Sequence, residues 1–387
     1  MCVIMKEMYM NIDKNKPKFS PSLCVTHNCN LNCVYCYQKH DAAGRMTLET
    51  AKSTIDWIFD NIPSDMSEVE IGFIGGEPLM EIELIKNIIA YTYSKQRTDN
   101  FIFFATTNGT LLTDADKEWL TCHKDHFVLG LSLDGARETH NHNRCDSFDK
   151  IDIDFFLRNW PDQGIKMTLT DYSIKHLAEN IKYVHSRGFK VINGVNLCEG
   201  VFDWDRDEYI QILIPQLAEL VEFYIENDKI ELNQMFNIEL GLCEEKNMDG
   251  WDCGVGRGAF FFDVDGRRFP CPFITPMTFT ETELNEIMKT DFYNPELFID
   301  DECLKNCYIY PICTSCAGTN YLSNHTFKKR NRKQCRIHKL NSIFIADLTA
   351  KRIVKNPKIY DDNQLYHTIE AIKKIRELYL PEFSVFF

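Results

Sequence analysis

From Pro21 to about Arg206, short apolar runs alternate with amphipathic segments, and this alternation restricts the fold more than any other feature. Apolar runs that predict strands lie at 23–25, 69–74, 101–106, 127–133 and 190–197. Segments with the spacing of amphipathic helices lie at 47–61, 81–93 and 174–187. Strands that alternate with helices pair in parallel through right-handed crossovers. The sequence therefore predicts an α/β sheet or barrel.

The same pattern divides the chain into five parts. Residues 1–18 are a polar tail, 19–206 are the α/β unit, and 207–250 read as a helical connection. From 251 to 340 the helical period is lost while Gly, Pro and Cys become frequent, which predicts a loop-rich module with little regular structure. Residues 341–387 return to a helical pattern.

The charge balance excludes some classes of partner. The formal net charge is -14 and the pI is about 5.3, so the surface gives no general attraction to nucleic acid or to anionic lipid. No apolar run approaches the ~18–20 residues that cross a bilayer, and the N-terminus has no signal-peptide pattern. We expect a cytoplasmic protein that binds neither nucleic acid nor a membrane.

Sixteen cysteines in such a chain favour metal binding over a disulfide framework. Cys29, Cys33 and Cys36 follow the run at 23–25, so they occupy a loop at the carboxyl end of a strand. Three thiolates can hold three irons of a cubane cluster and leave the fourth open, whereas a structural zinc site or an electron-transfer cluster takes four ligands. A zinc knuckle completed by His27 or His40, or simply buried cysteines, are the alternatives.

Four motifs together resemble the radical S-adenosylmethionine (SAM) superfamily, from residue 21 to about 335. Cys29-x3-Cys33-x2-Cys36, with the aromatic Tyr35, is similar to the superfamily signature. Gly75-Gly76-Glu77-Pro78 resembles its motif after the second strand, and Thr107-Asn108-Gly109 the motif after the third. The fourth is Ser132-Leu133-Asp134-Gly135, followed by His140 and by Asn143-Arg144.

The resemblance implies a fold, a cofactor and a set of site residues. The fold would be a partial (β/α)6 TIM-like barrel, followed by the loop-rich module and terminal helices. The reaction would begin with reductive cleavage of SAM to a 5′-deoxyadenosyl radical. Glu77 would meet the methionine amino group, Ser132 and Arg144 its carboxylate, and Tyr35 the adenine. The other expected SAM-binding residues are Gly75, Gly76, Asn108 and Asp134.

A second cysteine group resembles the SPASM extension, which usually carries two auxiliary [4Fe–4S] clusters, for a total of three. By the family pattern an inner cluster would be held by Cys253, Cys271 and Cys316, and an outer one by Cys303, Cys307, Cys313 and Cys335. The quartet Cys303, Cys307, Cys313 and Cys316 has its three-residue gap first and its two-residue gap last, the reverse of the family order. The fourth inner ligand is either Cys243, or the site is open to a substrate thiolate or water. Two zinc sites are the competing interpretation of this module.

The resemblance also suggests the reaction class. SPASM enzymes mostly modify ribosomally made peptides, and sulfatase-maturating members carry an aspartate base after the second SPASM cysteine. Pro272 stands there and cannot accept a proton. We therefore expect a thioether or carbon–carbon cross-link on a peptide or small protein, with sulfatase maturation as the first alternative. A non-catalytic zinc or iron–sulfur protein is the alternative of another class.

The expected partners follow from that reaction. An electron donor such as flavodoxin or ferredoxin would supply the reducing electron. Only about 18 residues precede the barrel, too few for a leader-binding domain. A separate leader-peptide-binding protein, or the barrel and SPASM surface, would then bind the leader.

Overall fold

The computed structural model describes residues 19–38, 44–63, 68–95, 100–198, 202–245, 254–257 and 259–387. Four parallel strands form one side of the fold, in the order β4-β3-β2-β1. They are β1 (Ser20–Thr26), β2 (Glu68–Gly75), β3 (Asn100–Thr107) and β4 (Phe127–Leu131). The sequence predicted all four.

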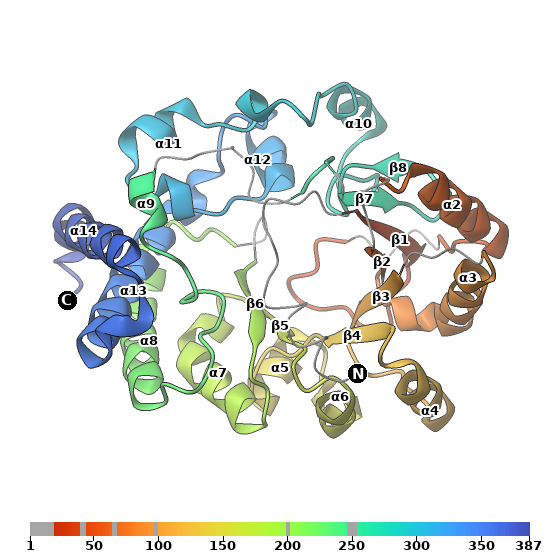
Figure 1. The fold of residues 1–387 in the computed structure, drawn as a ribbon, viewed down its shortest axis with the longest axis horizontal. Coiled ribbons are helices and arrows are strands. Elements are labelled where there is room, and N and C mark those ends of the chain that lie inside the picture. The colour runs from red at the N-terminus through yellow and green to blue at the C-terminus, as the bar shows by residue number, and fades with distance from the viewer. Residues whose placement is uncertain are drawn as a thin grey trace.

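A second parallel pair continues the arc. It consists of β5 (Ile165–Leu169), which the sequence analysis did not identify, and β6 (Ile192–Leu197). A single bridge between Ser132 and Lys166 joins the end of β4 to β5. The six strands curve within a ring of helices (Figure 1), and among the described residues they do not close into a complete barrel. The predicted α/β fold with a partial barrel is confirmed.

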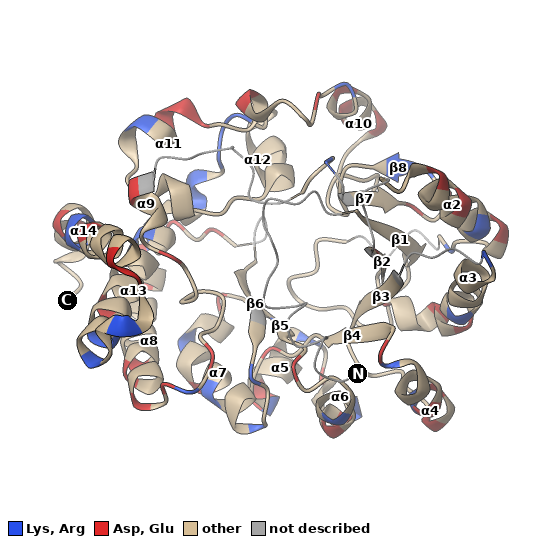
Figure 2. Ribbon diagram, in the orientation of Figure 1, with Lys and Arg blue, Asp and Glu red and all other residues tan. Residues whose placement is uncertain are grey.

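The helices between the strands bury one face each. For α2 (Leu48–Asn61), the Thr47 side chain accepts a hydrogen bond from the Thr50 amide and so caps the first turn. Its buried face includes Ala51, Ile55 and Ile58, as the helical spacing predicts. The other barrel helices are α3 (Ile82–Ser94), α4 (Asp114–His123), α5 (Arg137–Asn143), α6 (Ile153–Asn159) and α7 (Leu177–Ser186). Charged residues lie mainly on these helices and on the connections, and the strands are largely uncharged (Figure 2).

The segment 251–340 is more regular than the sequence suggested. Within this loop-rich segment the described residues include three short α-helices that the sequence did not predict: α10 (Glu281–Ile287), α11 (Asp301–Asn306) and α12 (Ala317–Asn324). Each is a few turns at most, too short for a hydrophobic period to show. Its first strand, β7 (Ala259–Phe262), pairs in parallel with β1, and β8 (Arg268–Phe269) pairs antiparallel with β7. One sheet therefore runs from the barrel into this segment.

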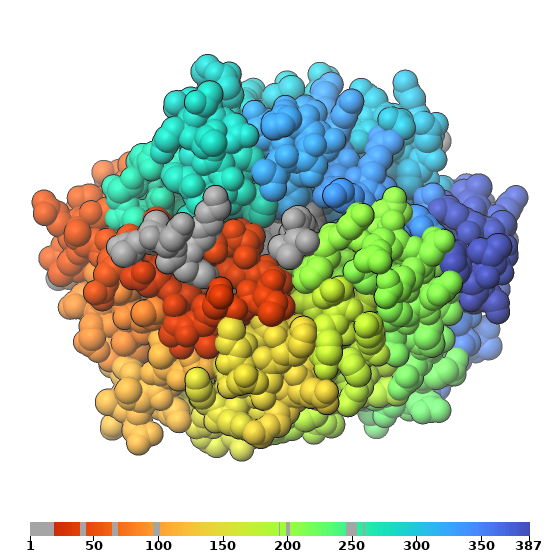
Figure 3. All heavy atoms as spheres, turned by 180° about the vertical axis from the view of Figure 1, so that it is seen from behind, coloured from red at the N-terminus to blue at the C-terminus, as the bar shows by residue number. Residues whose placement is uncertain are grey.

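The remaining α-helices form a group in which each packs on at least one other member. They are α8 (Asp207–Glu226), α9 (Leu242–Glu245), α13 (Cys335–Lys355) and α14 (Asp362–Tyr379). Seen from behind, the C-terminal half lies along one side of the barrel segments (Figure 3). No helix in the described parts of the chain is both long enough and apolar enough to cross a bilayer.

Candidate active site

The loop after β1 carries the three N-terminal cysteines, and all three are partly buried. The Val34 amide donates to the Asn143 carbonyl at 3.0 Å, which ties the middle of the loop to the end of α5. The Leu31 amide points at Cys29 Sγ, 3.4 Å away. The loop is therefore fixed by backbone contacts at the carboxyl ends of the parallel strands.

The electrostatics of the three thiols show that they share one environment. Burial raises the pKa of Cys33 to about 12 and raises the pKa of Cys29 and of Cys36 above its usual value. The positive charge of Arg144 lowers the pKa of all three thiols and so opposes the effect of burial. Three partly buried thiols facing one cation fit a metal cluster that needs thiolate ligands.

Gly75 and Gly76 allow β2 to approach this loop closely. A Cβ atom at position 75 would lie 2.3 Å from the Thr26 carbonyl oxygen, and one at 76 would lie 2.4 Å from the Asn28 carbonyl oxygen. The Gly76 amide donates to Thr26, and the Glu77 amide to Asn28. The glycines are required because the cysteine loop occupies the space of their side chains.

Glu77 is buried and joins the ends of β2 and β3. Its carboxylate accepts hydrogen bonds from Thr107 Oγ1 at 2.7 Å, the Asn108 amide at 2.7 Å and the Leu79 amide at 3.1 Å. Burial raises the pKa of Glu77, while these three hydrogen bonds oppose the rise. In this structure its contacts are with the strand ends, so a direct contact with the SAM amino group stays a prediction. Asn108 in turn donates to Asn30 of the cysteine loop at 2.9 Å.

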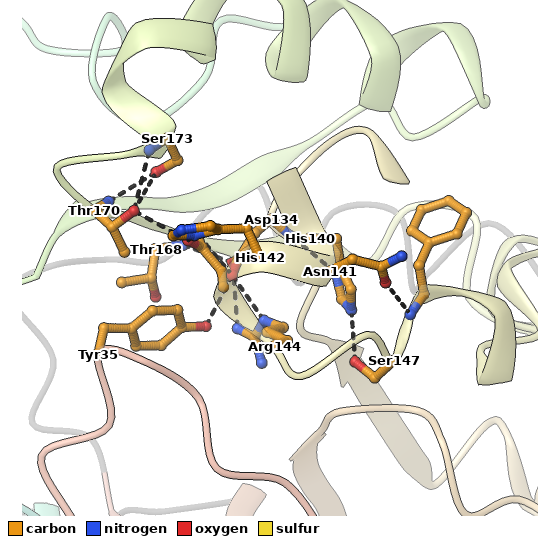
Figure 4. Close-up of polar contacts among 12 residues, drawn as sticks. Tyr35, Asp134, His140, Asn141, His142, Arg144, Ser147, Thr168, Thr170 and Ser173 are labelled. Carbon is orange, nitrogen blue, oxygen red and sulfur yellow. Dashed lines mark hydrogen bonds and ion pairs between the residues drawn. The ribbon is translucent and has the colours of Figure 1, made fainter. Parts of the chain in front are cut away.

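Asp134 is the centre of the polar network at the end of β4 (Figure 4). Its carboxylate accepts from Arg144 Nε at 2.9 Å, from the Tyr35 hydroxyl at 3.0 Å and from the Thr168 amide at 3.0 Å. Burial alone would lower the pKa of Arg144, but the negative charge of Asp134 outweighs this effect and raises the pKa above its usual value, so the guanidinium stays charged. Arg144 therefore reaches the site as one half of a buried ion pair.

Several residues of this network were not assigned a role from the sequence. Thr168 lies on β5, and Asn143 donates to Asp134 at 3.3 Å while accepting from Thr170 at 3.0 Å. His140 Nδ1 accepts a weak hydrogen bond from the Asp134 amide at 3.4 Å. The alternating pattern of residues 165–169 was the available signal for β5. Ser132, which the sequence did assign, donates its amide to Thr107 at 2.9 Å beside the network.

Four cysteines of the second group line one cavity. They come from α11, the connection after it and the start of α13, and they are Cys303, Cys307, Cys313 and Cys335. The sequence assigned the same four to the outer auxiliary cluster. Four thiols around one cavity fit a four-cysteine cluster or a zinc ion, and the reversed spacing does not prevent their convergence.

Cys271 and Cys316 lie on the side of the module that faces the N-terminal loop. Burial, followed by the charges of Cys36, Cys271 and Cys316, raises the pKa of Tyr37, whose ring lies 5.1 Å from that of Phe273. The Tyr37 hydroxyl is therefore near both cysteine groups. Cys253, the third predicted ligand of the inner cluster, and His40 lie outside the described residues.

Cys243 is buried, and the structure places it beside the outer group. Burial raises its pKa to about 12, with further contributions from the charges of Glu244 and Cys307. Cys307 is one of the four cavity cysteines. Cys243 is thus a buried thiol near the outer cavity, and the role of Cys243 as an inner ligand stays a prediction.

His27 makes a contact that the sequence did not suggest. Its Nε2 atom lies 2.6 Å from Asp263 Oδ1, and both side chains are buried. Asp263 follows β7 directly, and His27 precedes Cys29 by two residues. This contact reinforces the pairing of β1 with β7 immediately below the cysteine loop.

Comparisons with known proteins agree with this arrangement. The Radical SAM superfamily matches residues 23–213. A cysteine-type anaerobic sulfatase-maturating enzyme of Clostridium perfringens is 24% identical over 330 residues, 75% of this chain and 85% of that protein. An uncharacterized protein of Methanocaldococcus jannaschii is 29% identical over 177 residues. The aligned part is 44% of this chain and 60% of that relative.

Two solved structures show the same fold. The structure of anSMEcpe with bound AdoMet and the Kp18Cys peptide superposes with a TM-score of 0.68 and 21% identity, covering 89% of this chain and 100% of that one. Streptococcus suis SuiB bound to its precursor peptide SuiA superposes with a TM-score of 0.55 and 17% identity, over 82% of this chain and 75% of that one.

Proposed function

The chain belongs to the Radical SAM superfamily through residues 23–213, and we propose that it is a SPASM-type radical enzyme that modifies a peptide. One observation carries this proposal: the thiols of Cys29, Cys33 and Cys36 all lie near the buried Arg144–Asp134 ion pair, and the charge of Arg144 lowers the pKa of each thiol. Three cysteines would hold one [4Fe–4S] cluster, and the strand-end residues would hold SAM. Together these groups supply a carbon-centred radical that removes a hydrogen atom from a substrate.

The chain's own residues position that chemistry. Asp134 orients Arg144 by accepting hydrogen bonds from Nε and Nη2 of the guanidinium, which leaves Nη1 for a carboxylate ligand. Burial raises the pKa of Tyr35 well above its usual value, so its hydroxyl keeps its proton and donates to Asp134. Gly76 and Glu77 hold the end of β2 against the cysteine loop.

The auxiliary part would complete the reaction. We assign Cys303, Cys307, Cys313 and Cys335 to one [4Fe–4S] cluster, and Cys271 and Cys316, together with Cys253, to another. The position of Cys271 and Cys316 beside Tyr37 suits the transfer of an electron away from the substrate radical, which a thioether or carbon–carbon cross-link requires. A flavodoxin or ferredoxin would supply the electron that starts each turnover, and a separate protein could present the peptide leader.

Sulfatase maturation is the second candidate, because the anaerobic sulfatase-maturating enzyme of Clostridium perfringens aligns with 75% of this chain. We place it second since Pro272 replaces the expected base. Incubation of the reduced protein with a sulfatase peptide that contains Cys or Ser separates the two. An aldehyde on that peptide would overturn the cross-linking assignment.

The radical assignment itself has a direct test. The reconstituted protein should convert SAM to 5′-deoxyadenosine in the presence of dithionite, and the variant with Cys29→Ala, Cys33→Ala and Cys36→Ala should not. Continued production by that variant would refute the assignment. Analysis of iron, sulfide and zinc after anaerobic purification distinguishes an iron–sulfur enzyme from a zinc-binding protein.

A further inference from the structure

Lys166 is a charged residue on the inner side of the barrel arc. On β5 its neighbours Ile165, Met167 and Leu169 are fully or almost fully buried in the hydrophobic core. Because side chains alternate along a strand, Lys166 points to the opposite face. It lies there with Thr168, whose amide binds Asp134. Lys166 is thus one side-chain position below the SAM-binding network on the same face.

The Lys166 side chain reaches across β4 to β3. Its Nζ atom donates to Thr106 Oγ1 at 2.9 Å and lies 5.4 Å from the centre of the Phe104 ring. Thr106 is opposite Gly130 in the register of β3 and β4, so no side chain from β4 blocks this path. Thr106 and Phe104 alternate with Phe103 and Ala105, which are fully buried on the outer face. The ammonium group is therefore directed into the arc.

The protein around Lys166 removes part of its hydration, while solvent still reaches the side chain. The residue is exposed, yet desolvation by the surrounding protein lowers its pKa. The charge of Glu70 on β2 opposes the lowering, but Glu70 accepts its hydrogen bond from Ser20. No ion pair involves Lys166 within the described parts of the chain.

A partly desolvated cation held by a neutral hydroxyl and an aromatic ring is suited to bind an anion. The head group contacts Thr106 and Phe104 of β3, whereas the described partners of the Asp134 carboxylate are Tyr35, Asn143, Arg144 and Thr168. The Lys166 ammonium is therefore separate from the expected position of the SAM carboxylate. We infer that Lys166 binds a carboxylate of the peptide substrate, so that the preferred substrate has an acidic residue near the modified position. This inference rests on the proposed function.

The experiment uses reductive methylation of lysines with formaldehyde, followed by mass spectrometry of the reconstituted full-length protein. The probes are the capped tripeptide acetyl-Gly-Glu-Gly-amide and its glutamine counterpart, each with SAM present. We expect the glutamate peptide to protect Lys166 at a concentration about 10- to 100-fold lower than the glutamine peptide, as expected for one charge-assisted hydrogen bond. Lys190, whose ion pair with Asp162 is exposed, should be methylated equally in all samples.

Equal protection by the two peptides, or no protection by the glutamate peptide, would overturn the inference. A second result would also overturn the inference: SAM protects Lys166 from methylation but decarboxylated SAM does not. Lys166 would then bind the carboxylate of the cofactor. Lys166→Met and Lys190→Met should bind SAM with equal affinity, which checks that the first variant folds. The only reductant is the hydride donor that reductive methylation needs, and no one-electron donor to the cluster such as dithionite is added. Absence of 5′-deoxyadenosine in a separate assay with dithionite would therefore refute the radical function without affecting this result.

Discussion

Arg144 and Asp134 form a buried ion pair in which Arg144 Nε lies 2.9 Å from Asp134 Oδ2, at the carboxyl end of β4. The substitution Asp134→Asn keeps the shape and removes the charge, so it leaves a buried guanidinium without its counter-charge. We expect the free energy of unfolding to fall by about 3–5 kcal/mol. Urea unfolding of the two proteins measures the difference.

A surface pair of the same residue types is the control. Arg137 and Asp149 form an ion pair with both side chains more than half exposed, so Asp149→Asn should change the free energy of unfolding by less than about 1 kcal/mol. Equal effects of the two substitutions would show that burial does not set the cost at Asp134.

Stability should also depend on the ionisation of His140, which is fully buried. Desolvation and the charge of Arg144 lower its pKa to about 4. In the unfolded chain His140 takes up a proton near its ordinary pKa of about 6.5. In the folded state it takes up that proton only near pH 4. The contribution is present above pH ~6.5 and is lost as the pH falls toward 4, with a total of about 3 kcal/mol. His140→Gln should show a weaker loss of stability over this range than the parent protein, and identical slopes would contradict the assignment.

The contact between Gly76 and the cysteine loop predicts a local defect in cluster binding. In Gly76→Ala the new methyl group would lie 2.4 Å from the Asn28 carbonyl oxygen and 2.9 Å from Cys29 Cβ, so the loop must move. We expect that variant to lose about four irons per chain and to cleave SAM at least ~10-fold more slowly. Gly241→Ala is the control, since its nearest contact would be 3.4 Å. Normal iron content in Gly76→Ala would contradict the role of this glycine.

The outer cysteine cavity can be tested separately from the N-terminal site. Cys313→Ser changes one of the four cavity thiols and should remove about four irons per chain if they hold a [4Fe–4S] cluster. Production of 5′-deoxyadenosine should continue, because the N-terminal cysteines are unchanged. Cys122→Ser, at an exposed position on α4, should leave the iron content unchanged. Loss of one zinc instead of iron would identify a zinc site.

The sequence predicted much of the barrel because its elements have local signals. Thr47 and the apolar face of α2 are adjacent in sequence, and the first four strands end in recognisable turns. The helix expected at 174–187 is interrupted by a short 3₁₀ turn, Ser173–His176, before α7. Gly188 ends α7 with a φ of 106°, as its position suggested.

The remainder depended on contacts between distant residues. The partners of Asp134 come from residues 35, 143, 144 and 168, and no local pattern indicates that an arginine expected to bind SAM is paired with a carboxylate of its own motif. Strand β5 has five residues and includes a lysine, which hid both the strand and the candidate substrate contact. The pairing of β7 with β1 could not be predicted either, since the two strands are far apart in sequence.

That last pairing has a consequence for how the chain folds during synthesis. Ser20 is paired with Ala259, so one edge of β1 has no partner until the ribosome has made about two thirds of the protein. At ordinary elongation rates of ~5–20 residues per second, the edge beside the cysteine loop waits for about 10–50 s. An unpaired strand edge invites intermolecular pairing during this interval. We expect the nascent barrel to depend on chaperone protection, and chains truncated before β7 to aggregate.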